Sequence, residues 1–475
     1  MRSASFGLSI AYVILTAVLT MSLTASVQAE EAGLTTFHGK PCTSAHKKHT
    51  IPAKTLRAIV QSHGKWLDER HNPDYKRADL CQADLRQAVL IGANLEKANL
   101  EGAQLQQANL YQSTLAQASL AGADLTKAGM EDSNISGADL RKARLSKVNL
   151  FRSVGDEAAL FDAVLTGTQL HESTFERAHF EGADLSSADL TNASFVDSYF
   201  YGANLHRAIL AGTDLMGADL RRTNLTKANM HQTNLQGALL DGAQLSGARL
   251  EEADLEGAYF DEADLTEANL REALLRGADL RFTNLQSAGL QQADLEGVNF
   301  EGARLVKVNA QSANATMAIL YHANLDEADF RDARLHHAVL IEARGEGAIF
   351  AKADLTEIYA PKVSLRRARF NEATLEAANL VAADLRGANF SHAILAHANL
   401  QEANLQGALF HGADLSGARL DTADLRQANL RGANLTAVTG LSQPQLDSAC
   451  LDEQTKLPPE LKRPAPCTEK KSKKK

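Results

Sequence analysis

The sequence predicts an all-β solenoid, and three periodic features lead to this fold class. A large apolar residue occupies nearly every fifth position from Leu80 to Leu435, which gives 72 positions in one unbroken frame. Ala, Ser or Thr stands two residues before almost every one of these centres. Asp or Asn directly precedes 38 of the 72 centres. A strict repeat of this kind is typical of a solenoid, in which each repeat packs only on its neighbours.

A period of five excludes a single long helix or a single long strand. On an α-helix, residues five apart are turned by ~140°, so the centres would not form one apolar stripe. On a strand they would alternate between the two faces. The chain must therefore change direction about once per quintet, with two residues facing inward and three outward. Five centres lack a large side chain, namely Gly155, Ala310, Ala315, Gly345 and Ala360.

Quintets such as those in ADLRQANLRGANL (Ala423–Leu435) resemble the pentapeptide-repeat family. The resemblance covers residues 76–440. It implies a right-handed quadrilateral parallel β-helix with four quintets per coil, and therefore about 18 coils for the 72 quintets. It also implies that the centre and the small residue lie inside.

The spacing of phenylalanine supports four quintets per coil independently. Phe occupies centres at intervals of twenty residues, and rings in successive coils can stack. We therefore expect ladders of rings at Phe330, Phe350, Phe370, Phe390 and Phe410, at Phe175 and Phe195, and at Phe180 and Phe200. Ala360 would lie on the wall opposite the long ladder and offset its volume. Drift of unselected repeats is the alternative reading of the irregular centres.

The first 29 residues read as a signal peptide. Arg2 precedes an uncharged, largely apolar run, Phe6–Val27, and Val27-Gln28-Ala29 suits a signal peptidase. The mature chain would begin at Glu30 in the periplasm or outside the cell, with no membrane span left. Because the run is long, an uncleaved membrane anchor is the alternative.

The segments that flank the repeats are predicted to close the two ends of the solenoid. Residues 30–75 contain one amphipathic helix that would cover the first coil and protect its open β-edge. In residues 441–467, Ser442 can cap a short helix, Pro444 fits its first turn and Leu446 would cover the last coil. Residues 468–475 form a disordered basic tail that either solubilises the chain or meets anionic envelope surfaces. The helix's apolar face consists of Leu56, Ile59, Val60, His63, Trp66 and Leu67.

The four cysteines stand beside the two ends of the repeats. In an exported protein this placement favours two disulfide bonds, Cys42–Cys81 and Cys450–Cys467. Free thiols are the alternative for a cytosolic chain. No CxxC pair is present, so neither redox catalysis nor a structural zinc site is indicated.

The sequence gives no indication of catalysis, and we expect no catalytic, cofactor-binding or metal-binding residues. Phosphate-binding loops, nucleophile elbows and HExxH are absent, and His336-His337 is the only adjacent histidine pair. A polysaccharide-active β-helix enzyme is an alternative, but it would need loops that form a cleft. The 72 quintets contain no insertion that could supply such loops.

A second alternative comes from the family resemblance. Some cytosolic members mimic duplex DNA and occupy the DNA site of type II topoisomerases. Residues 76–440 carry 33 Lys and Arg against 48 Asp and Glu, a net charge of −15. A rod of ~86 Å would need about 50 negative charges to match DNA of that length. The charge and the signal segment therefore argue against this function, and no nucleic-acid partner is expected.

The remaining interpretation is an envelope interaction or scaffold protein that binds an unknown protein partner or a second copy. The residues just before centres 80, 100, 120 and so on would point outward, and this row is unusually apolar. We expect a docking surface or, alternatively, scattered surface apolar residues. Pro361, beside this row, predicts a local bend of the rod. The predicted partner-binding residues are Ile319, Val339, Tyr359, Tyr199 and Tyr259.

Overall fold

The protein is described by a computed structural model, which covers residue 42 and residues 44–69 and 72–464. Apart from Cys42, these residues belong to one compact unit, Ser44–Lys475. The predicted signal peptide (1–29), Cys467 and the basic tail (468–475) lie outside the described residues.

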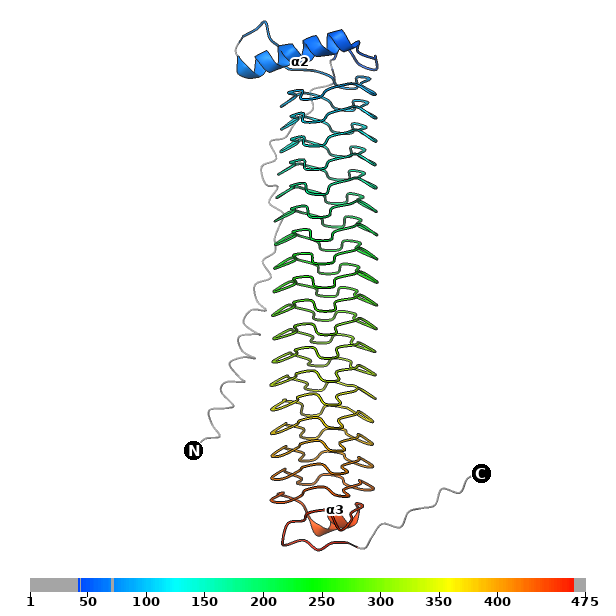
Figure 1. Ribbon diagram of the computed structural model, residues 1–475, viewed down its shortest axis with the longest axis vertical. Helices are drawn as coiled ribbons and strands as arrows, with labels where there is room; N and C mark the ends of the chain where they lie inside the picture. Colours follow the sequence, from blue (N-terminus) through cyan, green and yellow to red (C-terminus); the bar gives the residue numbers. More distant parts are fainter. Residues whose placement is uncertain (1–41, 43, 70–71, 465–475) are drawn as a thin grey trace, which may run out of the picture. The chain divides into compact units, whose positions relative to one another are not determined.

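The repeat region forms a parallel β-helix in which one coil takes twenty residues. The residue before each centre makes a parallel bridge to the residue twenty positions further on, as in Asp79↔Asn99 and Asn99↔Ser119. Figure 1 shows the coils stacked along one axis. Four quintets therefore complete each turn, as the phenylalanine spacing predicts. The bridges are isolated rather than part of longer strands, because the chain turns within every quintet.

Three backbone hydrogen bonds per quintet hold each coil to the next. In the first coil, the N–H groups of Leu80 and Gln82 donate to the carbonyls of Asn99 and Glu101, both at 2.7 Å. The N–H of Asn99 donates back to Ala78 at 2.9 Å. The second residue after each centre has a positive φ, which turns the chain toward the next wall.

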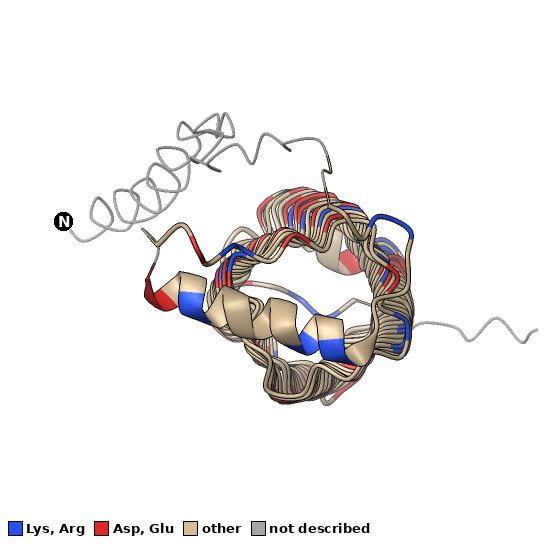
Figure 2. Cartoon of the chain, turned by 90° about the horizontal axis from the view of Figure 1, so that it is seen from above, with Lys and Arg blue, Asp and Glu red and all other residues tan. Residues whose placement is uncertain are grey.

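The interior consists of the centres and the small residues two positions before them. The other three residues of each quintet face outward. Seen along the axis, positions of Lys, Arg, Asp and Glu are distributed around the ring of stacked coils (Figure 2). Leu80, Leu435 and nearly all centres between them are buried completely. The apolar core is thus continuous along the whole stack.

The predicted phenylalanine ladders are present. Phe350, Phe370 and Phe390 stack with ring centroids 5.1 and 4.8 Å apart and planes within 8° of parallel. Phe330 and Phe410 extend this ladder at its two ends. The rings of Phe175, Phe180, Phe195 and Phe200 form a second cluster on two adjacent walls.

The glycine centre at position 155 makes room for a ring of the next coil. A Cβ atom on Gly155 would lie 2.2 Å from the ring of Phe175, twenty residues further along the same wall. The ring of Phe175 therefore fills the space that a side chain at position 155 would occupy, and the core stays packed.

Helix α2 (Ala53–Asp68) lies across the N-terminal end of the coils (Figure 1). Its residues Leu56 and His63 are buried, and Ile59 and Val60 pack on the core. His63 is fully buried, deeper than the sequence suggests. Just before α2, Thr50 makes a parallel bridge to Asp84 and so extends the ladder over the first coil.

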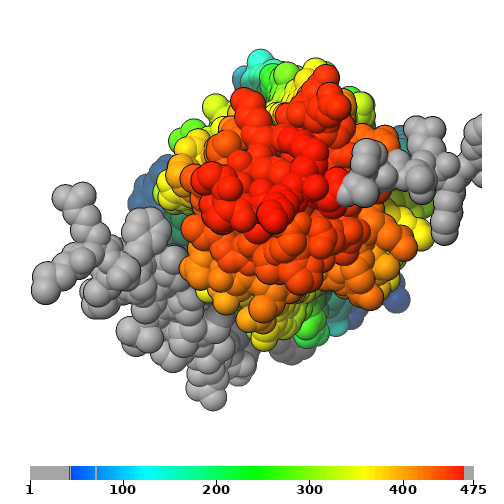
Figure 3. Space-filling model, turned by 90° about the horizontal axis from the view of Figure 1, so that it is seen from below, coloured from blue at the N-terminus to red at the C-terminus, as the bar shows by residue number. Residues whose placement is uncertain are grey.

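Helix α3 (Gln443–Asp447) follows the last coil, with Ser442 as N-cap residue and Leu446 buried. The side chain of Gln445 donates to the carbonyls of Leu420 and Ala423, both at 2.9 Å. In Figure 3, the segment after residue 440 (red) lies over the last coil (orange).

The ladder continues beyond the last quintet. Cys450 pairs with Asn429, and Lys456 pairs with Asn434. These offsets exceed twenty residues, because α3 and its flanking turns intervene. The five-residue pattern therefore ends before the β-pairing does.

The cysteine prediction agrees with the structure where the residues are described. Cys42 and Cys81 form a disulfide bond. Cys450 is also disulfide-bonded, while its predicted partner Cys467 is outside the described residues.

Candidate functional site

One of the four outer faces carries most of the outward aromatic side chains. We call it the aromatic face: the residues before centres 80, 100, 120 and so on, with the two turn residues after each of those centres. In the described part of residues 76–440, the outward aromatic residues away from this face are Tyr111 and Phe151. Those on it are Phe161, Tyr199, Tyr201, Tyr259, Phe282, Tyr321 and Tyr359.

The structure places three of the predicted docking residues on consecutive coils. Ile319 bridges Val339, and Val339 bridges Tyr359. All three are half-buried rather than fully exposed, since each stands between coil neighbours. Tyr199 and Tyr259 are more open, at 40% and 48% exposure, and lie toward the middle of the same face.

Asp and Asn before the centres act as caps of the turns. Their side-chain oxygen accepts the N–H of the residue two positions later, as from Ser136 to Asn134 and from Ser416 to Asp414, both at 2.9 Å. This N–H takes no part in the bonds between coils, so the side chain supplies its acceptor. The sequence shows the preference but not this role.

An apolar residue before a centre leaves that turn without its cap. Among the described residues, the N–H groups of Tyr321 and Ile341 find no acceptor on Ile319 and Val339. At Tyr359 the problem does not arise, because Pro361 has no N–H to cap.

The predicted bend at Pro361 is wrong. The bridges Val339↔Tyr359 and Tyr359↔Asn379 continue the ladder without interruption. Proline is tolerated because the first turn residue donates no hydrogen bond between coils.

Toward the N-terminal end, the aromatic face carries a stack of rings. His179 lies between Phe161 and Tyr199, with ring centroids 5.0 and 4.6 Å away. The guanidinium groups of Arg221 and Arg222 lie about 6 Å from the ring of Tyr201.

The middle of the aromatic face carries two carboxylates that the sequence reasoning missed. Asp241 and Asp261 occupy the first turn position on consecutive coils, and the N–H of Asp261 donates to Asp241 at 3.0 Å. Burial raises the pKa of both carboxyls, and Asp279 raises them further. Phe282 stands on the adjoining corner. The predicted docking residues all directly precede centres, whereas Asp241 and Asp261 directly follow centres 240 and 260.

Several other aspartates of the rod are paired locally with arginine. In DLR quintets the arginine reaches back to the aspartate two residues earlier, as Arg386 does with Asp384 at 2.6 and 2.8 Å. These bonds lower the pKa of Asp384 below its ordinary value. Fixed ion pairs therefore neutralise part of the negative charge along the rod.

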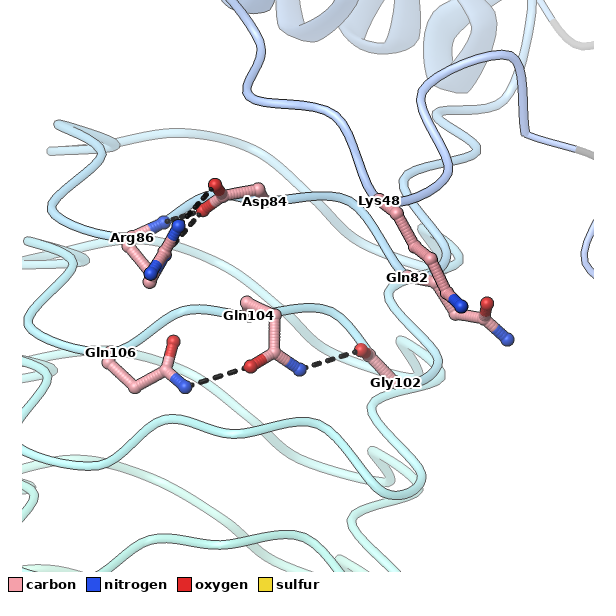
Figure 4. A pocket seen from close by; sticks show the side chains of 7 residues that line it. All are labelled: Lys48, Gln82, Asp84, Arg86, Gly102, Gln104 and Gln106. Carbon is pink, nitrogen blue, oxygen red and sulfur yellow. Dashed lines mark hydrogen bonds and ion pairs between the residues drawn. The ribbon is translucent and has the colours of Figure 1, made fainter.

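A polar hollow of about 510 Å³ opens beside the first coils. Figure 4 shows Arg86 paired with Asp84, and Gln104 bonded to both Gln106 and Gly102. Asp84, Arg86 and Gln104 are thus turned toward partners within the lining, whereas Oε1 of Gln106 has no hydrogen-bond partner among the described residues. Lys48 and Gln82 complete its lining.

Within residues 42, 44–69 and 72–464, no three or more His, Cys, Asp or Glu side chains are arranged to hold a metal ion. In the same part of the chain, no helix combines the length and apolarity that crossing a bilayer requires.

The model of the family "Pentapeptide repeats (8 copies)" matches the chain in overlapping segments from residue 76 to residue 439. No curated protein matches the chain.

Several solved structures are similar to the chain over part of its length. HetL of Nostoc sp. strain PCC 7120, a pentapeptide-repeat protein involved in heterocyst differentiation regulation, is 32% identical over 53% of this chain and 90% of its own, with a TM-score of 0.18. A pentapeptide-repeat protein of the Arabidopsis thaliana thylakoid lumen is 31% identical over 20% of this chain and 65% of its own, with a TM-score of 0.19. QnrB1, a plasmid-mediated fluoroquinolone resistance protein, is 19% identical over 46% of this chain and 92% of its own, with a TM-score of 0.20.

Members of the matched family fold as right-handed quadrilateral β-helices and are in general non-enzymatic structural or interaction proteins. The twenty-residue bridging, the inward centres and the family match over most of its length agree: the chain belongs to the pentapeptide-repeat family.

Proposed function

We propose that the protein is a non-enzymatic scaffold of the cell envelope, periplasmic or secreted, whose rod presents an outer face to a protein partner. The rod would have about 18 coils, from the 72 quintets of the sequence. Helices α2 and α3 would close its two ends, so that binding takes place on the sides.

The observation that carries the proposal is the concentration of outward aromatic side chains on one face of four. A contiguous apolar patch on a soluble protein commonly marks an interaction surface. Ile319, Val339 and Tyr359 form such a patch on consecutive coils, with Tyr321 and Ile341 beside them.

The apolar patch has a cost that quintets with Asp or Asn before the centre avoid. Replacing the capping Asp or Asn by Ile319 or Val339 gives up a turn hydrogen bond, worth about 0.5–1.5 kcal/mol. In addition, the apolar side chains of Ile319 and Val339 remain half-exposed to solvent. Binding of a partner would bury these side chains and offset the loss.

Two features support an envelope location. The first 29 residues have the composition of a signal peptide. Disulfide bonds at Cys81 and Cys450 suit an oxidising compartment.

The docking surface is tested by the triple change Ile319→Asn, Val339→Asn and Tyr359→Asn in the native chain. Asn is the repeat's own residue at this position, so the rod should keep its circular dichroism spectrum and thermal transition. We expect in-cell crosslinking to the partner, or to a second copy, to be lost. A control triple change on another outer row, Asn109→Ser, Asn149→Ser and Asn229→Ser, should leave crosslinking intact. Unaltered crosslinking in the Ile319, Val339 and Tyr359 variant would show that the surface is not the docking site.

The location is tested by fractionation and by sequencing of the mature N-terminus. We expect a chain that begins at Glu30 in the envelope or medium, with Cys450 linked to Cys467 in non-reducing mass mapping. A soluble cytosolic chain that retains Met1 and free thiols would contradict the envelope proposal and favour the DNA-mimic alternative.

A further inference from the structure

Two exposed aromatic rings lie on adjacent coils of the aromatic face. Phe282 is 56% exposed and Tyr259 is 48% exposed. Phe282 also has a φ of 55°, in the left-handed region that bulky residues rarely adopt. A Cβ atom on Gly302 would lie 2.6 Å from its ring, so the glycine of the next coil leaves space for it. The second turn residue of every quintet shares this positive φ, so what distinguishes Phe282 is its exposed ring, for which Gly302 leaves space.

Two carboxylates near Tyr259, Asp261 on its own coil and Asp241 on the preceding coil, lack an arginine of their own. Asp219 and Asp279 are each paired with the arginine two residues later, at 2.6 and 2.8 Å. Asp241 and Asp261 have no such ion pair among the described residues, and Arg221 and Arg281 act on them only through space. One oxygen of Asp261, Oδ1, is shielded from water and has no hydrogen-bond partner among the described residues.

We propose that Tyr259, Phe282, Asp241 and Asp261 form a docking site for a lysine or arginine side chain of the protein partner. The inference rests on the proposed interaction function and names the chemistry that the aromatic face recognises.

The placement of the four residues fits a cation. Tyr259 and Asp261 are two residues apart on one coil, and Phe282 is on the corner of the next coil. A cationic group is attracted both to carboxylates and to the face of an aromatic ring. The aliphatic stem of Lys or Arg would cover Tyr259 and Leu239, which is half-buried on the preceding coil.

Burial of the two carboxylates supports the same assignment. Their pKa values are raised chiefly because burial disfavours the charged form; repulsion by Asp279 adds to the shift, whereas Arg221 and Arg281 oppose it. A docked cation would relieve this repulsion. An anionic or purely apolar ligand would not.

The site is tested in the full-length protein with 4-fluorophenylalanine at position 282 as a reporter. The probe is a hexa-arginine peptide, and hexacitrulline provides a ligand of the same shape without charge. We expect a saturable change of the fluorine resonance with hexa-arginine alone. Asp241→Asn with Asp261→Asn should weaken binding about fivefold or more.

The matched control is Glu252→Gln with Glu272→Gln, which removes two charges from consecutive coils on a different corner. We expect its affinity for hexa-arginine to stay within twofold. Equal weakening in both double variants would show general attraction by the acidic rod and overturn the site. An unresponsive fluorine resonance would overturn it as well.

Two further outcomes separate this inference from the proposed function. If the Ile319, Val339 and Tyr359 variant loses its partner but the reporter at 282 stays silent, the scaffold function stands and the cation site fails. If removal of the lysine-rich tail (468–475) shifts the resonance of the free protein, a second copy's tail occupies the site and the assignment to a partner protein fails.

Discussion

Each position of the quintet has a separate physical task. The centre and the small residue fill the interior, and the residue between them bridges the next coil. The same bridging residue, when it is Asp or Asn, caps the turn that follows. The second turn residue adopts a positive φ, which Gly does without strain and other residues adopt at some cost.

At the residue scale, we predict that the phenylalanine ladder contributes strongly to stability. Phe370 is buried between Phe350 and Phe390, so Phe370→Ala should lower the free energy of unfolding by about 3–5 kcal/mol. Chemical denaturation followed by circular dichroism measures this change.

The matched control for the ladder is Phe282→Ala, which removes an exposed ring of the same size. Its effect should fall within about 0.5 kcal/mol, the range of ordinary surface substitutions. Similar losses in the two variants would contradict the assignment of Phe370 to a tightly packed core.

At the scale of elements, one buried histidine joins helix α2 to the solenoid by hydrogen bonds, in addition to the apolar contacts of the helix. The N–H of Ala78 donates to Nδ1 of His63 at 3.1 Å, and Nε2 of His63 donates to the carbonyl of Glu96 at 2.9 Å. One ring nitrogen accepts and the other donates, so the bound ring is neutral. His63 therefore satisfies backbone groups that the end of a β-helix would otherwise leave open.

This geometry predicts that acid loosens α2. Burial lowers the pKa of His63 below 6.5, and Arg77 lowers it further, whereas the bond to Glu96 opposes the shift. The undocked helix exposes His63 at its ordinary pKa, so docking is complete above about 6.5 and weakens as the pH falls below that value. Trp66, the single tryptophan of the chain, stacks on His63 and should report the change by fluorescence between pH 7.5 and 5.

The control for this titration is His63→Gln, which keeps a donor and an acceptor but does not titrate. Its Trp66 fluorescence should be constant over the same pH range. A pH response that persists in the glutamine variant would mean that another group controls α2.

The sequence predicted the fold and both helices because their signals are local and periodic. The five-residue spacing, the twenty-residue ring spacing and the apolar face around Leu56 and His63 each depend on neighbouring residues. Pairing of Cys450 and Lys456 with the last coil was not predicted, since α3 breaks the frame. The carboxylates of Asp241 and Asp261 were missed because they stand out only by comparison with aspartates that pair with an arginine two residues later. Asp219 and Asp279 have such an arginine, and Asp241 and Asp261 do not.

At the scale of the whole molecule, position along the sequence determines which face a residue occupies. Residues twenty apart share a face, as the bridges show, whereas residues five apart lie on successive walls. Tyr199, Tyr259 and Ile319 therefore share one face at intervals of sixty residues.

Two deletions test this relation between sequence and face. Removal of 211–230 takes out one coil and should leave a folded, shorter rod that still binds the partner through Ile319, Val339 and Tyr359. Removal of 211–215 should also fold, because the four walls use the same quintet, but it turns every later residue by one wall. We expect the shorter deletion to separate the Tyr199 region from the Ile319 region and to weaken partner capture.

Thermal unfolding serves as the control, since both deletion variants should melt cooperatively. Equal partner capture by the two variants would contradict an extended binding face and would restrict binding to one end of it.

The uninterrupted frame has a consequence for how such a chain can evolve. Gains or losses of five residues preserve folding but move every later residue to the next wall. They therefore change which side chains share a face without a detectable effect on stability. Gains or losses of twenty preserve both folding and surface. A five-residue change between Phe161 and Tyr359 would therefore divide the aromatic face between two walls, whereas a twenty-residue change would leave it on one wall.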